Sequence, residues 1–151
     1  MNFSAKTEYG VRLMVELGRQ YGGSPTSLKA ISEAEGLPLS YLEHVVADLK
    51  RAGLVEATRG ARGGYRLERP PTKIGMDDVV MALEGTLAPM DCFVSLPTQR
   101  VNCSHEVDRG HACATKLLWT RVQGGVVRAL KGTTLAELVE FSESHAPVAA
   151  A

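Results

Sequence analysis

The sequence predicts a mainly α-helical fold: a winged helix-turn-helix with a small β-hairpin wing, followed by a long C-terminal dimerisation helix. Three patterns lead to this fold class. Residues 28–52 form two amphipathic helical segments joined by a tight turn. Residues 54–67 have β-type runs around a Gly- and Arg-rich loop, and residues 113–131 have apolar side chains at helical spacing.

The first element expected is a helix that begins after Ser4, a residue suited to capping, and runs to about Tyr21. Its apolar face would contain Gly10, Leu13, Met14, Leu17 and Tyr21. Glu8 and Arg12 fall on the opposite, polar face, four positions apart, which is the spacing of an ion pair.

The helix-turn-helix is the sharpest local pattern. Its first helix is expected at about 28–35, with Leu28, Ile31 and Ala34 inward and Gly36 at its end. The second helix follows Pro38, and Ser40 with Glu43 has the spacing of a capping box. A stripe at positions i, i+3, i+4 and i+7 is expected to be buried, and Gly53 to end the helix: Leu42, Val45, Val46, Leu49.

The wing follows at 54–67, with Arg59 and Arg62 in its turn. The whole chain has 17 basic and 17 acidic residues, but residues 50–69 contain six basic residues and only two acidic ones. A local basic surface is what a phosphate backbone meets. The polar side of the second helix and the wing turn therefore give the candidate DNA contacts: Ser40, Tyr41, Glu43, His44, Arg51, Arg59, Arg62.

The chain divides into four parts on this interpretation. Residues 1–71 form the DNA-binding domain, 72–90 a linking helix, 91–112 a cysteine cluster loop, and 113–144 the dimerisation helix and a C-terminal helix. The last helix is expected to start with a capping box at Thr134 and Glu137. No apolar run reaches the ~20 residues that span a bilayer, and no secretory signal is visible, so we expect a cytoplasmic protein without membrane contact.

All three cysteines, Cys92, Cys103 and Cys113, lie in or beside this loop. Thiolates are soft ligands for iron–sulfur clusters, zinc or copper(I). The C-x10-C-x9-C spacing is that of neither zinc fingers nor ferredoxins, so a cluster, zinc, a thiol switch and inert thiols all stay open. His105 and His111 are further candidate ligands.

No catalytic motif of the P-loop, GxSxG or HExxH type occurs in the sequence, so we do not expect an enzyme.

The strings MNFSAKTEYGVRLM, LPLSYLEHVVADLKRAGLV and RGARGGYRL, with three cysteines before a Trp-bearing helix, resemble the Rrf-two family of winged-helix transcriptional regulators over about residues 1–142. The resemblance implies a homodimer joined through helix 113–131 that binds a pseudo-palindromic double-stranded operator. It implies that the helix at 40–52 enters the major groove and that Arg59 reaches a minor groove. Cys92, Cys103 and Cys113 match the cluster ligands of iron–sulfur-sensing members.

Two departures from the family pattern concern the cluster. The gaps between the cysteines are longer here, and Lys116 occupies the position of a histidine ligand found in some members; a protonated lysine cannot bind iron. Other members use an acidic residue early in the first helix, and Glu8 matches it. The resemblance thus implies Glu8 as the fourth ligand, with an ion pair to Arg12 as the alternative role and His105 or His111 as alternative ligands.

The sequence therefore predicts a DNA-binding transcriptional regulator, and we expect it to be a repressor. We expect it to sense iron, redox state or nitric oxide through one cluster per subunit, of the 2Fe-2S or 4Fe-4S type. The alternatives are a cluster-free thiol-switch regulator, a zinc-binding winged-helix regulator, and an interaction module in which the winged helix is only a scaffold.

Overall fold

The computed structural model describes residues 3–88 and 113–144 of the chain. It confirms a mainly helical winged helix-turn-helix with a two-stranded wing. The elements, in chain order, are α1 (Ala5–Arg19), α2 (Leu28–Glu35), α3 (Leu39–Arg51), β1 (Val55–Thr58), β2 (Gly64–Leu67), η1 (Pro71–Lys73), α4 (Met76–Glu84), α6 (Ala114–Lys131) and α7 (Leu135–Ser144).

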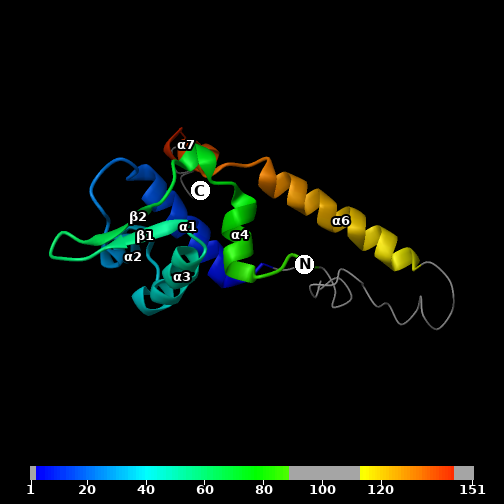
Figure 1. The fold of residues 1–151 in the computed structure, drawn as a ribbon, viewed down its shortest axis with the longest axis horizontal. Coiled ribbons are helices and arrows are strands. Elements are labelled where there is room, and N and C mark those ends of the chain that lie inside the picture. Colours follow the sequence, from blue (N-terminus) through cyan, green and yellow to red (C-terminus); the bar gives the residue numbers. More distant parts are fainter. Residues whose placement is uncertain (1–2, 89–112, 145–151) are drawn as a thin grey trace, which may run out of the picture.

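Most elements pack around α1 in a compact head, which we define as α1–α4, the wing strands β1 and β2, and α7 (Figure 1). The turn between β1 and β2 projects from the rest of the head on one side, and α6 extends from the head on the other (Figure 1). The two wing strands are antiparallel, with Val55 opposite Leu67 and Thr58 opposite Gly64. The wing and the exposed helix thus lie at opposite ends of the described chain.

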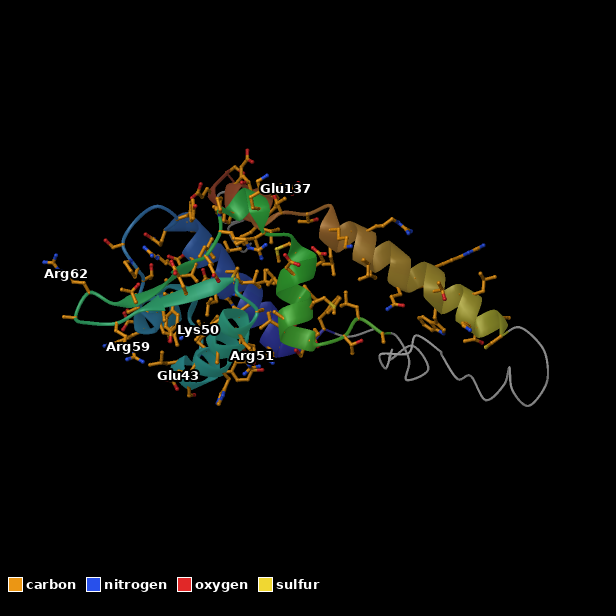
Figure 2. All side chains as sticks on the ribbon, in the orientation of Figure 1. Glu43, Lys50, Arg51, Arg59, Arg62 and Glu137 are labelled. Carbon is orange, nitrogen blue, oxygen red and sulfur yellow. The ribbon has the colours of Figure 1, made fainter. Side chains whose placement is uncertain are left out.

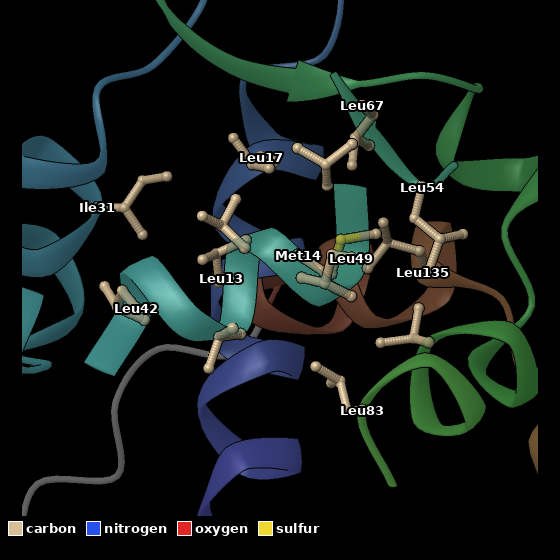
Figure 3. Packing of buried hydrophobic residues seen from close by; sticks show 14 of the residues in the cluster. Leu13, Met14, Leu17, Ile31, Leu42, Leu49, Leu54, Leu67, Leu83 and Leu135 are labelled. Carbon is tan, nitrogen blue, oxygen red and sulfur yellow. The ribbon is translucent and has the colours of Figure 1, made fainter. Parts of the chain in front are cut away.

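One hydrophobic core holds the head together. It takes Leu13, Met14 and Leu17 from the buried face of α1, the predicted stripe of α3, and Leu54 and Leu67 from the wing base (Figure 3). Leu83 of α4 and Leu135 of α7 close it on the far side (Figure 3). Burial of these side chains, each worth roughly 1.5–3 kcal/mol, fixes the position of α3 relative to the wing.

The ends of α1 and α7 have the predicted caps. The Ser4 hydroxyl accepts a hydrogen bond from the Thr7 N–H at 3.4 Å. Thr134 and Glu137 form a reciprocal capping box, in which Glu137 N–H donates to Thr134 Oγ1 at 3.3 Å and Thr134 N–H donates to Glu137 Oε2 at 2.6 Å. These caps satisfy N–H groups that have no partner inside the helix.

Three details of the predicted helices are wrong. The helix α3 begins at Leu39 with Pro38 at its N-cap, so Ser40 already lies within the first turn and makes no capping box with Glu43. Ala34 is exposed, because the apolar stripe of α2 continues to Leu37 in the turn that follows Gly36. Tyr21 is 49% exposed, because α1 ends at Arg19 and the helical spacing no longer applies beyond it.

The helix α6 differs from the others because none of its residues is buried within the chain. Leu117, Leu118 and Val122 are 58%, 55% and 36% exposed, although all three are apolar. None of the helices in the described ranges is long and apolar enough to cross a membrane.

Candidate nucleic-acid interface

The polar face of α3 is exposed along its length. Ser40, Tyr41, Glu43, His44 and Arg51 all lie on the surface, opposite the buried stripe of the same helix. Because Leu42, Val45, Val46 and Leu49 anchor that stripe in the core, the rotation of α3 about its axis is fixed. The sequence-predicted side chains on α3 are therefore presented together, on one face.

Tyr41 is held by a contact that the sequence analysis missed. Its ring meets the ring of Tyr9 on α1 edge to face, with ring centroids 5.3 Å apart and an interplanar angle of 79°. Such pairs add roughly 0.5–1.5 kcal/mol beyond the area that they bury. The first turn of α3 is thereby fixed against α1, while 37% of Tyr41 stays exposed.

Asp48, by contrast, is a residue of this helix that the sequence analysis did not single out. Its carboxylate pairs with Lys6 of α1 and accepts a hydrogen bond from Arg51 Nη1 at 2.7 Å. The hydrogen bond from Lys6, with that of Arg51, lowers the pKa of Asp48, although burial opposes the shift. The i,i+3 spacing of Asp48 and Arg51 was a signal for their pair, but nothing in the sequence indicated Lys6.

The wing turn carries two arginines with no competing carboxylate. Among the described residues, neither Arg59 nor Arg62 makes a hydrogen bond or an ion pair, and both are exposed. Figure 2 shows Arg59 on the side of the wing where Glu43, Lys50 and Arg51 lie on α3, and Arg62 at the outer end of the wing turn, whereas Glu137 lies on α7 at the other side of the head. The two arginines are thus free to meet phosphate or base edges.

The basic residues of 50–69 are not equivalent. Arg66 pairs with Glu56 at 2.5 Å and Arg69 with Asp78 at 3.4 Å, and Arg51 is held by Asp48. Across the described ranges, Lys50, Arg59 and Arg62 have no such partner. The positive potential that a DNA backbone would meet is therefore concentrated on the end of α3 and on the wing turn.

The cysteine site is described only in part. Cys92, Cys103, His105 and His111 lie outside the described residues. Cys113 occupies the N-cap position of α6 and is half-buried. In 3–88 and 113–144, no group of three or more His, Cys, Asp or Glu side chains could hold a metal ion.

Glu8 lies on the exposed side of α1, with 67% of its side chain accessible. Its carboxylate is 3.9 Å from Arg12 Nη1, whereas the Arg12 Nε lies 3.0 Å from Glu35. Arg12 is thus held mainly by α2, and the Glu8–Arg12 ion pair is long. Glu8 has no other ion pair in the part of the chain that the structure describes.

Glu8 also lines an apolar groove of about 650 Å³ between α1, α4, α6 and α7, beside Val80 and Leu130. Leu130 is near the C-terminal end of α6, and Cys113 precedes its first turn, so about 25 Å of helix separates the two. Within one chain, the groove that Glu8 lines is thus at the C-terminal end of α6, and Cys113 is at the N-terminal end.

A helix-turn-helix with a basic wing and an exposed polar recognition face defines a DNA-binding protein of the winged-helix class. The chain belongs to the Rrf2 (Rrf-two) family, whose model, described as iron-dependent transcriptional regulator, matches residues 3–141.

Relatives of known name agree with this assignment. The chain is 36% identical over 145 residues to the HTH-type transcriptional regulator CymR of Bacillus subtilis, covering 96% of this chain and 94% of that protein. The solved structure of CymR, the global cysteine regulator of B. subtilis, superimposes with a TM-score of 0.75 at 35% identity, over 93% and 98% of the two chains. The structure of IscR from T. potens gives a TM-score of 0.74 at 33% identity, over 97% and 93%.

These relatives are transcriptional regulators and not enzymes, and this chain is accordingly a transcriptional regulator of the Rrf2 family.

Proposed function

We propose that the protein is a cytoplasmic homodimeric repressor that binds a pseudo-palindromic DNA operator. The observation that supports this proposal is that the exposed face of α3 and the unpaired Arg59 lie on one side of the head, with the unpaired Arg62 at the outer end of the wing turn (Figure 2). The face of α3 with Ser40, Glu43 and His44 enters the major groove, and Arg59 enters the adjacent minor groove. Occupation of the operator blocks transcription.

This proposal predicts unequal effects of two arginine substitutions. Arg59→Ala weakens operator binding by about 1–3 kcal/mol and relaxes sequence preference, because a narrow minor groove attracts an inserted guanidinium. Arg62→Ala weakens binding to operator and to random DNA by similar factors, because a phosphate contact carries no sequence information. Fluorescence anisotropy over a series of salt concentrations measures both.

Arg121→Ala is the matched control, since this exposed arginine lies on α6, far from the wing (Figure 1). The interface assignment is wrong if Arg59→Ala and Arg62→Ala bind operator as well as Arg121→Ala does.

The homodimer is supported by the exposure of α6. A helix of 18 residues with no buried position, and with Leu117 and Leu118 more than half exposed, needs a partner to cover its apolar side. A second copy supplies both an equivalent helix and the apolar groove beside Leu130. Two-fold symmetry then places two α3 helices on half-sites about one DNA turn, or 34 Å, apart.

We further propose that each subunit carries one iron–sulfur cluster, 2Fe-2S or 4Fe-4S, held by Cys92, Cys103 and Cys113. Support comes from the iron-dependent description of the family and from the grouping of all three cysteines in residues 92–113. A bound cluster would supply a centre sensitive to iron supply, oxidants or nitric oxide. Lys116, one turn into α6, does not fit as a ligand.

We propose that Glu8 supplies the fourth ligand from the second subunit. Its carboxylate is largely exposed and weakly paired with Arg12, so it is available, and it lines a groove at the opposite end of α6 from Cys113 of its own chain. His105 or His111 is the alternative fourth ligand. In the arrangement with Glu8, the head of one subunit is tied to the cysteine segment of its partner.

The cluster is tested by anaerobic purification, iron and sulfide counts, and visible absorption spectra. Each of Cys92→Ala, Cys103→Ala and Cys113→Ala should bleach the visible absorption, while Glu8→Ala should retain most of the colour and alter the spectrum. Arg12→Ala is the control: if it reproduces the effect of Glu8→Ala on DNA binding with neither changing the spectrum, Glu8 acts as an ion-pair partner.

A second candidate is a cluster-free regulator with a thiol switch or with zinc. The observation in its favour is the similarity to CymR, which is described as a cysteine regulator. A colourless protein with full operator affinity, whose affinity changes with thiol oxidation or with zinc removal, would select this alternative.

A further inference from the structure

The segment before α2 pairs with the wing as a third, very short strand would. Thr26 and Tyr65 exchange two backbone hydrogen bonds: Thr26 N–H donates to the Tyr65 carbonyl at 2.9 Å, and Tyr65 N–H donates to the Thr26 carbonyl at 2.8 Å. Tyr65 lies in β2 and its ring packs against the core. The strand β2 is therefore paired on both edges, with β1 on one side and Thr26 on the other.

Gly64 allows this close approach. A Cβ atom at position 64 would lie 2.5 Å from the carbonyl carbon and oxygen of Thr26, and 2.9 Å from the Ser27 nitrogen. These are backbone atoms of the bridge itself, so they cannot yield without breaking it. At Gly60, in the wing turn, a Cβ atom would meet nothing within 4 Å. Gly63, at the end of the turn, is also confined, since a Cβ atom there would lie 2.2 Å from the Thr58 carbonyl oxygen, but it is Gly64 that faces the backbone of Thr26 and Ser27.

The bridge joins the wing to the helix-turn-helix. Ser27, next to Thr26, is the N-cap of α2 and accepts a hydrogen bond from the Ala30 N–H at 3.1 Å. On the other strand, β1 follows directly from α3, where Leu54 N–H donates to the Leu49 carbonyl at 3.0 Å. The wing base is held from both helices of the motif, one through each strand.

A hairpin of two four-residue strands needs such support. Isolated two-stranded hairpins are marginal in water, and their direction is set by whatever else they pair with. The turn with Arg59 and Arg62 is beyond the last strand pair, Thr58 with Gly64, so a small change of angle at Gly64 is magnified at the arginines.

We propose that the Thr26–Tyr65 bridge, together with the absence of a side chain at Gly64, sets the direction of the wing relative to α3. This inference rests on the proposed function, in which α3 enters the major groove and Arg59 the minor groove. The bridge keeps the spacing between the α3 contact and the Arg59 contact fixed, so that the wing is already oriented for the minor groove before DNA binds. Thr26 and Gly64 are positioning residues and touch no base.

The test uses operators selected from a random-sequence duplex pool with the wild-type protein. Two mutated operators accompany the selected one, the first altered under α3 and the second altered in the flanking minor groove. Gly64→Ala should lose about tenfold or more in discrimination at the flank and retain it under α3. In the wild type, Arg59→Ala removes flank discrimination; in the Gly64→Ala background it should have no further effect.

Thr26→Pro removes the backbone N–H that donates to the Tyr65 carbonyl, and it leaves Gly64 unchanged. It should therefore lose discrimination at the flank and retain it under α3, as Gly64→Ala should. Thr26→Val keeps both backbone hydrogen bonds and is the matched control, with wild-type discrimination. Circular dichroism and light scattering on each variant report folding and oligomeric state. If one variant fails to fold, the other decides the result.

The inference is overturned if folded Gly64→Ala or Thr26→Pro retains flank discrimination, or if affinity falls equally on all three operators, as a purely structural defect would produce. Failure of the proposed function looks different: the wild-type protein would enrich no sequence, or Arg59→Ala would leave wild-type flank discrimination intact.

Discussion

Single carboxylates connect the N-terminal turn of α1 to other elements of the head. Glu84, the last residue of α4, accepts hydrogen bonds from the Ser4 N–H and hydroxyl, both at 2.8 Å, and from the Thr7 hydroxyl. Asp48 of α3 forms an ion pair with Lys6 from the same turn of α1. A negative charge at the N-terminus of a helix is also favoured by the helix dipole. Individual side chains thus fix where α1 begins relative to α3 and α4.

Glu84→Gln is expected to lower the free energy of unfolding at pH 7 by about 1 kcal/mol, because a neutral amide accepts these hydrogen bonds more weakly. Burial raises the pKa of Glu84, but the hydrogen bonds from Thr7 and Ser4 outweigh it and lower the pKa below its usual value. The stabilisation is therefore present above the usual glutamate pKa and is lost as the pH falls through the lowered pKa. Urea unfolding at a series of pH values measures it.

The control for this prediction is Glu140→Gln, since Glu140 is exposed on α7 and makes no side-chain hydrogen bond or ion pair within the ranges that the structure describes. A difference between wild type and Glu84→Gln that stays constant into strong acid would contradict the role of the charged carboxylate.

At the scale of elements, two glycines let α1 pack closely against its neighbours. An added Cβ at Gly10 would lie 2.3 Å from Leu83 Cδ1 of α4, and one at Gly18 would lie 2.6 Å from Val139 Cγ2 of α7. Both glycines are buried in the middle or last turn of α1. Glycine lowers helix propensity by about 1 kcal/mol, so the close packing of the three helices offsets that loss.

Gly10→Ala is expected to destabilise the protein by about 1–2 kcal/mol, because the overpacking against buried Leu83 exceeds the gain in helix propensity. Thermal unfolding followed by circular dichroism measures the effect. Combining it with Leu83→Ala, which removes the opposing methyl groups, should give a loss smaller than the sum of the two single losses. Additive losses would show that the Gly10–Leu83 contact is not what limits the side chain at position 10.

At the scale of the whole molecule, the described chain is long, with the wing at one end and α6 at the other (Figure 1). A monomer of this shape leaves the apolar side of α6 in water. A dimer joined through α6 would place its two wings and two α3 helices apart from each other, as a two-half-site operator requires. The proposed oligomeric state and the proposed DNA site therefore depend on the same helix.

Leu118→Glu is expected to give monomers and to weaken operator binding by about 100-fold or more, because linked half-site contacts are lost. Light scattering and anisotropy measure the two effects. Thr120→Glu adds the same charge at another exposed position of α6 and should leave both unchanged. Operator binding at wild-type affinity by a monomeric Leu118→Glu variant would contradict the dimeric site.

Much of the fold follows from local sequence. The buried stripe of α3 and the caps at Ser4 and Thr134 depend on residues within one or two helical turns, and all three are confirmed. The incorrect predictions are also local. Pro38 is the N-cap of α3 and Ser40 is not, because the helix begins at Leu39. The exposed candidates on α3 were also found from helical periodicity, and Arg59 and Arg62 from the Gly- and Arg-rich turn of the predicted hairpin.

The sequence by itself determined the class of this protein: its helix-turn-helix, its basic wing, its uncovered last long helix and its family. Tertiary structure decided which charges are paired between elements, because Lys6 and Arg12 of α1 meet Asp48 of α3 and Glu35 of α2 only when these helices pack together. It also decided that Glu8 lines a groove at the opposite end of α6 from Cys113, and that Gly64 faces the backbone of Thr26. The physical reason is range: helix periodicity and capping act over a few residues, whereas these contacts join elements that chain connectivity alone leaves unplaced.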